Sequence, residues 1–239
     1  MKQHRQIQTV ILCGGKGTRM GHNDLPKPLF PVGGKPLLWH IMSIYSHYGF
    51  NEFILCLGYK KEKIEDYFKG NKKWRITFVD TGQDTNTGER IKKIEKLIKA
   101  DIFFATYGDG LSDVPLDKLL AFHLLHKKTA TLISVRSRSQ FGIISIDPHT
   151  SAVTQCHEKP LLDYWINGGF FVFNREVFSA IKENDVLEKE TFSKLVRGKA
   201  LVAYKHDGFW ECMDTYKDNL HLNQLWNSGL APWAVWHKK

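Results

Sequence analysis

The sequence predicts an α/β fold in which helices flank a mixed, mostly parallel sheet. Short apolar runs rich in β-branched residues alternate with amphipathic stretches through the first half of the chain. A glycine-rich, basic loop follows the first of these runs. After Ala130 the apolar runs lie closer together, which is typical of strands that join a sheet without intervening helices. Together these observations favour one sheet with a parallel part and an antiparallel extension.

The first half of the chain predicts repeated βαβ units. Strands are expected at Thr9–Cys13, Glu52–Leu57, Ile76–Asp80 and Ile102–Thr106. Helices are expected between and after them, at Leu37–Tyr48, Lys61–Phe68, Arg90–Ile98 and Leu116–Leu125. Parallel strands need such crossovers, so helices should cover both faces of the sheet. Ligands of these sheets bind at the carboxyl ends of the strands, where the polar loops of this chain also fall.

The second half predicts closely spaced strands and a final helix. The expected strands are Ala130–Val135, Phe141–Ile146, Ala152–Cys156, Gly168–Phe173 and Ala200–Tyr204, and the helix is Thr215–Trp226. Three tryptophans near the end (Trp226, Trp233 and Trp236) are expected to pack together or against another subunit, since no basic residue interleaves them as in a base-stacking surface. We expect a single domain, residues 1–239, with a nucleotide-binding part at about 1–128 and a sugar-binding part at about 129–239.

Composition bounds the partners of the protein. The chain has 239 residues, 42% of them hydrophobic, and a formal net charge of +9, which suits small polyanionic ligands. Its basic residues are scattered rather than gathered in a stripe, so no nucleic-acid partner is expected. The four cysteines form no C-x-x-C pair, which argues against zinc and disulfides and favours a cytoplasmic protein. No run approaches the roughly 18 apolar residues of a membrane span, and no membrane partner is expected.

The loop after the first strand has the composition of a phosphate site. Three glycines in four positions, Gly14, Gly15 and Gly17, let backbone N–H groups approach an anion, while Lys16 and Arg19 supply positive charge. The alternative is a tight surface turn. The spacing matches neither G-x-G-x-x-G nor the P-loop pattern, so neither a dinucleotide fold nor a P-loop ATPase is indicated.

Two aspartates are candidate metal ligands. Asp109 stands between two glycines at a strand end, and Asp214 precedes the last helix after an aromatic stretch. Two carboxylates together with phosphate oxygens are a common ligand set for Mg²⁺. The alternatives are an ordinary Asp-Gly turn for Asp109 and a helix N-cap for Asp214.

Two lysines beside prolines are candidate phosphate ligands. Pro26 and Pro28 restrict the backbone around Lys27, and Lys159 precedes Pro160. Fixed cations stabilise charge that spreads over transferring phosphoryl oxygens.

Other candidate residues have weaker patterns. The segment Asn167-Gly168-Gly169 offers an amide and an open backbone for sugar hydroxyls, with a β-bulge as the alternative. His123 and His126 have helical spacing but are expected to be a solvated pair rather than a metal site. No G-x-S-x-G pattern supports a serine hydrolase.

In combination these motifs resemble the sugar-phosphate nucleotidyltransferases, and within that family its cytidylyltransferases acting on glucose 1-phosphate. The resemblance covers nearly the whole chain. It is carried by the glycine loop with Lys27, by the Gly33–Met42 segment, by Tyr107-Gly108-Asp109-Gly110, and later by Glu158-Lys159-Pro160, Ile166–Val172, Gly208-Phe209-Trp210, Met213-Asp214-Thr215 and Ala231-Pro232-Trp233.

This resemblance implies the nucleotidyltransferase fold, a Rossmann-like sheet also described as the nucleotide-diphospho-sugar transferase fold. It implies Mg²⁺-dependent transfer of a cytidylyl group from CTP to a sugar 1-phosphate, most closely glucose 1-phosphate, in the supply of surface polysaccharide sugars. It implies catalytic roles for Arg19, Lys27, Asp109 and Lys159, and a metal held by Asp109 and Asp214. The implied nucleotide-binding residues are Leu12, Gly14, Gly15, Gly17, Thr18, Arg19, Lys27, Gly88, Arg90, Gly108 and Asp109, and the implied sugar-phosphate-binding residues are Glu158, Lys159, Asn167, Gly168, Gly169 and Asp214.

The sequence departs from the family pattern in two places. The segment between Phe68 and Asp80 is shorter than in relatives that carry an extended arm there, so we expect a homo-oligomer of simpler assembly. Glu89 stands where the family has a second glycine. Other substrates of the same chemistry, or a sensor that binds nucleotide sugars without catalysis, remain alternatives.

Overall fold

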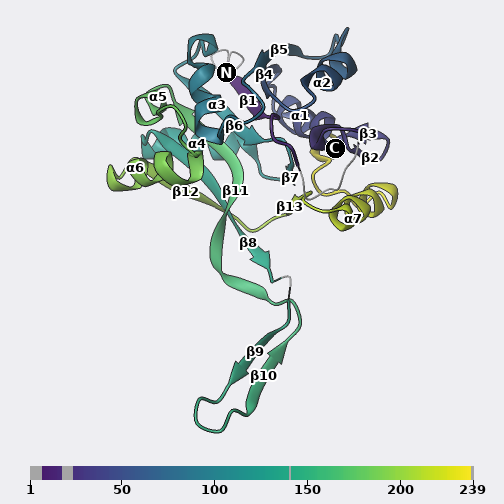
Figure 1. The fold of residues 1–239 in the computed structure, drawn as a ribbon, viewed down its shortest axis with the longest axis vertical. Coiled ribbons are helices and arrows are strands. Elements are labelled where there is room, and N and C mark those ends of the chain that lie inside the picture. Colours follow the sequence, from purple (N-terminus) through teal and green to yellow (C-terminus); the bar gives the residue numbers. More distant parts are fainter. Residues whose placement is uncertain (1–6, 18–23, 140, 238–239) are drawn as a thin grey trace.

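A seven-stranded sheet forms the centre of the molecule, in a computed structural model that describes residues 7–17, 24–139 and 141–237 (Figure 1). The strand order is β12-β8-β11-β6-β1-β4-β5. The strands are β1 (Gln8–Leu12), β4 (Glu52–Leu57), β5 (Arg75–Asp80), β6 (Ile102–Tyr107), β8 (Ala130–Arg138), β11 (Leu161–Asn174) and β12 (Leu201–His206). Within the described residues β11 alone runs against its two neighbours, so the predicted mixed, mostly parallel sheet is confirmed.

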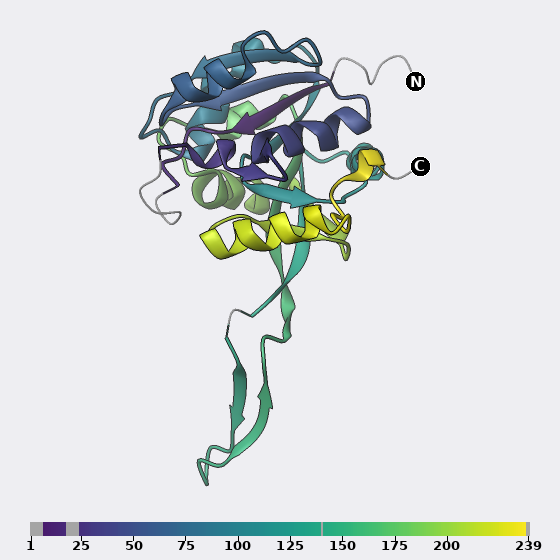
Figure 2. The same ribbon diagram turned by 90° about the vertical axis from the view of Figure 1, so that its right-hand side faces the viewer.

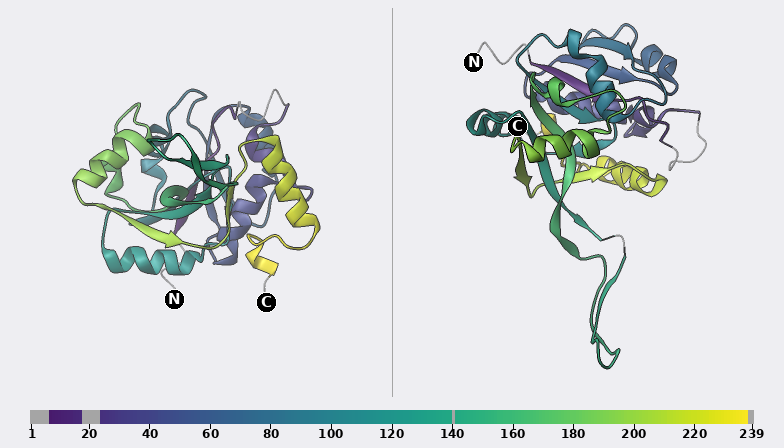
Figure 3. Two further views of the ribbon diagram at one scale, coloured as in Figure 1. Left: turned by 90° about the horizontal axis from the view of Figure 1, so that it is seen from below. Right: turned by 60° about the vertical axis from the view of Figure 1, so that its left-hand side comes forward.

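Helices cover both faces of this sheet because alternate residues of each central strand point to opposite sides. Ile11, Leu55 and Phe104 belong to one buried cluster, which also contains residues of α1 (Leu37–His47), α2 (Lys61–Phe68), α4 (Leu116–His126) and α7 (Tyr216–Asn227). Their neighbours along the strands pack with α3 (Thr87–Lys93), α5 (Val177–Ala180) and α6 (Phe192–Arg197). Seen from below, α6 and α7 lie on opposite sides of the molecule (Figure 3).

Several predicted boundaries were wrong in detail. The helix expected at Arg90–Ile98 starts three residues earlier, as α3, and ends in a separate 3₁₀ turn at Glu95–Leu97. The strand expected at Gly168–Phe173 is longer, because β11 continues through an irregularity between Asn167 and Phe171. Short pieces were not predicted: the π-helical turn Leu187–Thr191, the pair β2 (Pro31–Val32) and β3 (Lys35–Pro36), and the pair β7 (Gly110–Ser112) and β13 (Trp210–Cys212).

An arm projects from the body between β8 and β11 (Figures 1 and 2). It contains β9 (Ile143–Ile146) and β10 (Val153–His157), which expose every residue and, in the part of the chain that the structure describes, pair only with each other. The segment between Phe68 and Asp80 is compact, as expected. The simpler assembly expected from this segment stays a prediction, and the arm that projects from the body is built from a different segment.

Two further expectations concern buried polar and aromatic side chains. His123 is buried, with its ring nitrogens 2.8 Å from Thr131 Oγ1 and 3.0 Å from Asn174 Oδ1, so the expected solvated pair was wrong for His123. The C-terminal tryptophans pack around His40 as a cluster, as expected. None of the helices in the described part of the chain is long and apolar enough to cross a membrane.

Candidate active site

The glycine loop forms one wall of a cavity of about 570 Å³ at the carboxyl ends of β1 and β6. Its lining includes the predicted residues Leu12, Gly14, Gly15, Gly17, Lys27, Arg90, Gly108 and Asp109. Gly17 has a φ of +59°, which disfavours residues with a side chain, and a Cβ on Gly14 would overlap the Arg90 guanidinium. At Gly15, by contrast, a Cβ would meet no atom within 4 Å, so this part of the loop is open. Thr18 and Arg19 lie outside the described residues.

Arg90 ties the glycine loop to the opposite wall of this cavity. Its side chain is buried and donates to the carbonyl oxygens of Gly14, Leu57 and Gln83 and to Thr81 Oγ1, at 2.7 to 3.2 Å. Burial lowers the pKa of Arg90 from its ordinary value. The predicted nucleotide-binding arginine is thus also the group that positions the loop.

The segment 184–188 closes the cavity from the side of α3. Gly88 N and Glu89 N both donate to Asp185 O, and a Cβ on Gly88 would lie 2.7 Å from that oxygen. Gly88 therefore supports the wall through close backbone packing and is not among the described lining residues. Glu89 accepts from Asn184 N and pairs with Lys93, so the residue that replaces the family glycine is directed away from the cavity.

The two predicted metal aspartates meet, although they lie far apart in the sequence. Asp109 precedes β7 and Asp214 follows β13, and these strands pair so that Cys212 faces Gly110. Met213 N donates to Asp109 O at 2.9 Å. The N-cap of α7 is Thr215, in a capping box with Asp218, so the carboxylate of Asp214 is not the cap of that helix.

The ammonium of Lys27 lies between these two carboxylates. Lys27 Nζ is 2.8 Å from Asp109 Oδ2 and 2.6 Å from Asp214 Oδ1, and only 11% of its side chain is exposed. Burial alone would lower the pKa of Lys27, but the two carboxylates outweigh it and the pKa is raised. One atom each of Asp109, Asp214 and Cys212 lies within 4.8 Å of the others. The carboxylate oxygens suit a hard divalent cation such as Mg²⁺, and burial raises the pKa of the Cys212 thiol, which keeps it protonated.

A second cavity of about 220 Å³ adjoins the first, and Tyr107 and Asp109 line both. Its remaining lining includes the predicted residues Asn167, Gly168, Gly169 and Asp214, together with Trp210. Trp210 Nε1 donates to Gly168 O at 2.7 Å, and Asn167 Oδ1 accepts from Gly169 N at 2.9 Å. The register of β11 shifts between Asn167 and Phe171, and the residues Asn167–Gly169 line this cavity. A β-bulge and a ligand site are therefore compatible interpretations of this segment.

Sequence reasoning missed Glu188, which contacts Tyr107 of both cavities and Thr87 of the larger one. Its carboxylate accepts from the Tyr107 hydroxyl and, at 2.8 Å, from Thr87 Oγ1, while Asn167 Nδ2 lies 3.3 Å from the same Tyr107 oxygen. Burial, and then the negative charge of Glu188, raise the pKa of Tyr107. Glu188 lies in the π-helical turn, a geometry that often marks functional sites but that has no periodicity by which a sequence could reveal it.

The structure does not bring Glu158 and Lys159 to either cavity. They lie where the arm rejoins β11, with their side chains 75% and 49% exposed, and Lys159 Nζ is 3.7 Å from Glu158 Oε1. Among the described residues neither lines the two cavities. Their contact with a sugar phosphate stays a prediction.

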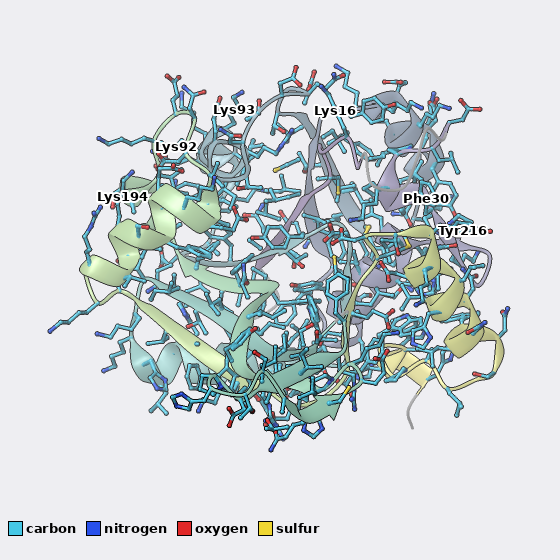
Figure 4. The ribbon with its side chains drawn as sticks, turned by 60° about the horizontal axis from the view of Figure 1, so that its bottom comes forward. Lys16, Phe30, Lys92, Lys93, Lys194 and Tyr216 are labelled. Carbon is cyan, nitrogen blue, oxygen red and sulfur yellow. The ribbon has the colours of Figure 1, made fainter. Side chains whose placement is uncertain are left out.

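The polar site is distinct from another cavity in the described part of the molecule. That cavity, of about 640 Å³, lies beside the C-terminal tryptophans and has no lysine or carboxylate in its lining. In Figure 4, Lys92, Lys93 and Lys194 lie on one side of the molecule and Phe30 and Tyr216 on the other, with Lys16 of the glycine loop between them. The two adjoining polar cavities are the candidate active site.

Residues 8–226 match the family described as nucleotidyl transferase. The chain is 42% identical to a probable glucose-1-phosphate cytidylyltransferase of Bacillus subtilis and 39% identical to the glucose-1-phosphate cytidylyltransferase of Salmonella typhimurium. In both cases the alignment covers 96% of this chain and all of the relative. Among solved structures, HddC from Yersinia pseudotuberculosis complexed with GMP-PN has a TM-score of 0.72 and 23% identity, covering 92% of this chain and 99% of that one. At this identity the structural likeness shows the fold.

Proposed function

The chain belongs to the nucleotidyl transferase family, and we propose that it transfers the cytidylyl group of CTP to glucose 1-phosphate, forming CDP-glucose and pyrophosphate. The names of the two bacterial relatives support this choice of substrates, because the likeness extends over their full length. The structural observation that carries the proposal is the pair of cavities that share Asp109, with Lys27 at their junction.

The two cavities suit two substrates of different size. The larger one, with its glycine loop and basic residues, would take the nucleoside triphosphate, and the smaller one the hexose phosphate. We propose Leu12, Gly14, Gly15, Gly17, Lys27, Arg90, Gly108 and Asp109 for the nucleotide and Asn167, Gly168, Gly169 and Asp214 for the sugar phosphate. This assignment corresponds to the proposed division into a nucleotide-binding part at about 1–128 and a sugar-binding part at about 129–239.

The proposed chemistry is an in-line displacement at the α-phosphorus of CTP. An oxygen of the sugar 1-phosphate forms the new P–O bond, the bond from the α-phosphorus to the bridging oxygen breaks, and pyrophosphate leaves with that electron pair. The attacking oxygen is already ionised at neutral pH, so the protein needs no general base and contributes position and charge. Backbone N–H groups of the glycine loop and the Lys27 ammonium would stabilise the negative charge that develops on the phosphoryl oxygens.

Asp109 and Asp214 would hold the divalent cation of this reaction, which we propose is Mg²⁺. When bound, the cation would neutralise phosphate charge and withdraw electrons from the α-phosphorus. The donor set fits this role, because two carboxylate oxygens converge where a cationic group of the protein already binds them.

Glu158 and Lys159 would reach the acceptor phosphate only if the base of the arm moved toward the smaller cavity or came from another copy of the chain. The arm supports our proposal of a homo-oligomer, since Ile143, Ile144 and Ile146 are exposed on it and a lone two-stranded hairpin has little stability. The four cysteines are free, which is compatible with the reducing cytoplasm that we propose as its location.

Pyrophosphate release over a grid of nucleoside triphosphates and sugar 1-phosphates, with Mg²⁺ present, tests the proposal. We expect kcat/KM for CTP with glucose 1-phosphate to exceed that of every other pair by at least about tenfold. A faster reaction with another pair would replace the proposed substrates. If no pair reacts, the alternative of a sensor that binds without catalysis is favoured.

A further inference from the structure

The position of Lys27 has a consequence for how the divalent cation enters the site. Lys27 Nζ contacts one oxygen of Asp109 and one of Asp214 at 2.8 and 2.6 Å. These are the same two side chains that would bind the cation. The ammonium therefore already supplies a positive charge to the carboxylate pair, and in that position it repels a second cation.

The backbone around Lys27 restricts how the ammonium can leave. Lys27 stands between Pro26 and Pro28 and begins the 3₁₀ turn Lys27–Leu29. Two backbone hydrogen bonds close this turn, from Leu29 N to Pro26 O and from Phe30 N to Lys27 O. The Cβ of Lys27 lies 3.0 Å from the point where a Cβ on Gly17 would be, so the stem packs against the glycine loop. The end of the side chain beyond this packed stem is the part that can change partner, and Lys27 lines the larger cavity.

We propose that Lys27 and the divalent cation compete for Asp109 and Asp214, so that the free protein excludes the cation and accepts it only together with the phosphates of the nucleotide. The inference rests on the proposed function, since it assumes a nucleotide in the larger cavity. Two carboxylates and one ammonium carry a net charge of −1, and a divalent cation would change it to +1 with two cationic groups in contact range. Triphosphate oxygens beside the glycine loop offer Lys27 another anionic partner, which removes this repulsion.

The test measures Mn²⁺ binding to the nucleotide-free, full-length protein by the electron paramagnetic resonance signal of the free ion. Lys27→Met retains most of the side-chain length without its charge, and we expect it to bind Mn²⁺ at least tenfold more tightly than the unmodified chain. Lys27→Arg retains the charge and should bind as weakly as the unmodified chain. Lys61→Met is the matched control, because Lys61 forms the same kind of ion pair with Asp80 at a separate, exposed position, and its Mn²⁺ affinity should not change.

The double variant Lys27→Met with Asp109→Asn shows where the additional Mn²⁺ binds. Its Mn²⁺ affinity should return to that of the unmodified chain. Thermal unfolding gives a second readout, because an ion that binds only the folded state raises the melting temperature. Mn²⁺ should raise it for Lys27→Met and have no effect on the unmodified chain. If Lys27→Met does not fold, Lys27→Gln is measured in the same way.

Equal Mn²⁺ affinity in the unmodified chain and the neutral variants would overturn the inference, as would tight binding by the unmodified chain without nucleotide. The failure of the inference and the failure of the proposed function can be distinguished, because Mn²⁺ binding is measured without nucleotide and without turnover. If the unmodified chain transfers no cytidylyl group while Lys27→Met gains Mn²⁺ affinity, the proposed function fails and the competition stands. If the unmodified chain transfers the cytidylyl group but Lys27→Met gains no Mn²⁺ affinity, the proposed function stands and the competition fails.

Discussion

Replacing Arg90 by methionine removes the guanidinium that connects two walls of the larger cavity. The side chain is 4% exposed and donates four hydrogen bonds, to Gly14 O, Leu57 O, Gln83 O and Thr81 Oγ1. The substitution leaves a flexible apolar side chain of smaller size in the same place, so its main effect is the loss of these bonds.

The expected loss in the free energy of unfolding depends on which hydrogen-bond acceptors keep another donor when the guanidinium is removed. Gly14 O still accepts from Tyr59 N, and Leu57 O still accepts from Thr81 N and Thr81 Oγ1. Among the described bonds only Gln83 O loses its single donor. Gln83 is an exposed residue, so water can replace that donor. Four lost hydrogen bonds, partly offset by removal of a buried charge, predict a loss of about 2 kcal/mol in the free energy of unfolding.

Denaturant unfolding and steady-state kinetics measure the two consequences of this change. We expect KM for CTP to rise about tenfold, which corresponds to about 1.4 kcal/mol, because the glycine loop and the segment at Gln83 lose their connection. Arg75→Met is the control: its guanidinium is 3.2 Å from Glu52 but 73% exposed, and its loss should cost less than about 0.5 kcal/mol. Unchanged stability and KM in Arg90→Met would refute the reasoning, and a normal KM with lowered stability would show that the Gln83 segment does not bind nucleotide.

Three further predictions concern other parts of the molecule. Burial lowers the pKa of His40 to about 4, so this residue should lower folding stability by about 3 kcal/mol as pH decreases from above 6.5 to below 4. His40→Gln should lack this part of the pH dependence, and an unfolding free energy with the same pH profile in both proteins would contradict the prediction. Glu188→Gln should raise KM for both substrates by up to about fivefold, since Tyr107 borders both cavities; an effect on one substrate alone would exclude this linking role. Ile144→Asp with Ile146→Asp should lower the mass of the oligomer in light scattering, and an unchanged mass would show that the arm is not its interface.

The fold could be predicted from local sequence patterns because its strands are short, buried and regularly separated by helices. Glu52–Leu57 and Lys61–Phe68 have the predicted bounds, since apolar periodicity and the loops beside them agree. The arm was missed as a projecting element because short runs that contain Ile and Val look the same in an exposed hairpin and in a strand of the main sheet. Only the tertiary structure shows that Ile144 and Val153 have no core to cover.

The site could be predicted only as far as each residue has its own local signal. The glycine loop and Asp109 follow strands directly, so their place at one edge of the sheet follows from the topology. The contact between Asp109 and Asp214 depends on the short pairing of β7 with β13, which no periodicity reveals. Glu188 was missed for a similar reason, because its role arises from contacts with Tyr107 and Thr87 rather than from its sequence neighbours.

The most direct test of the account is the rate of pyrophosphate release from CTP and glucose 1-phosphate in Asp109→Asn, Asp214→Asn and the double variant. Asparagine keeps the shape of both side chains, removes the charge and replaces one carboxylate oxygen by an amide NH₂. The cap of α7 is provided by Thr215 and Asp218 and is not affected. We expect each single variant to lose at least about 100-fold in kcat and the double variant to lose little more than the worse single one, since residues that hold one cation act as a unit. Near-normal turnover in either single variant would show that its carboxylate does not serve the proposed metal site.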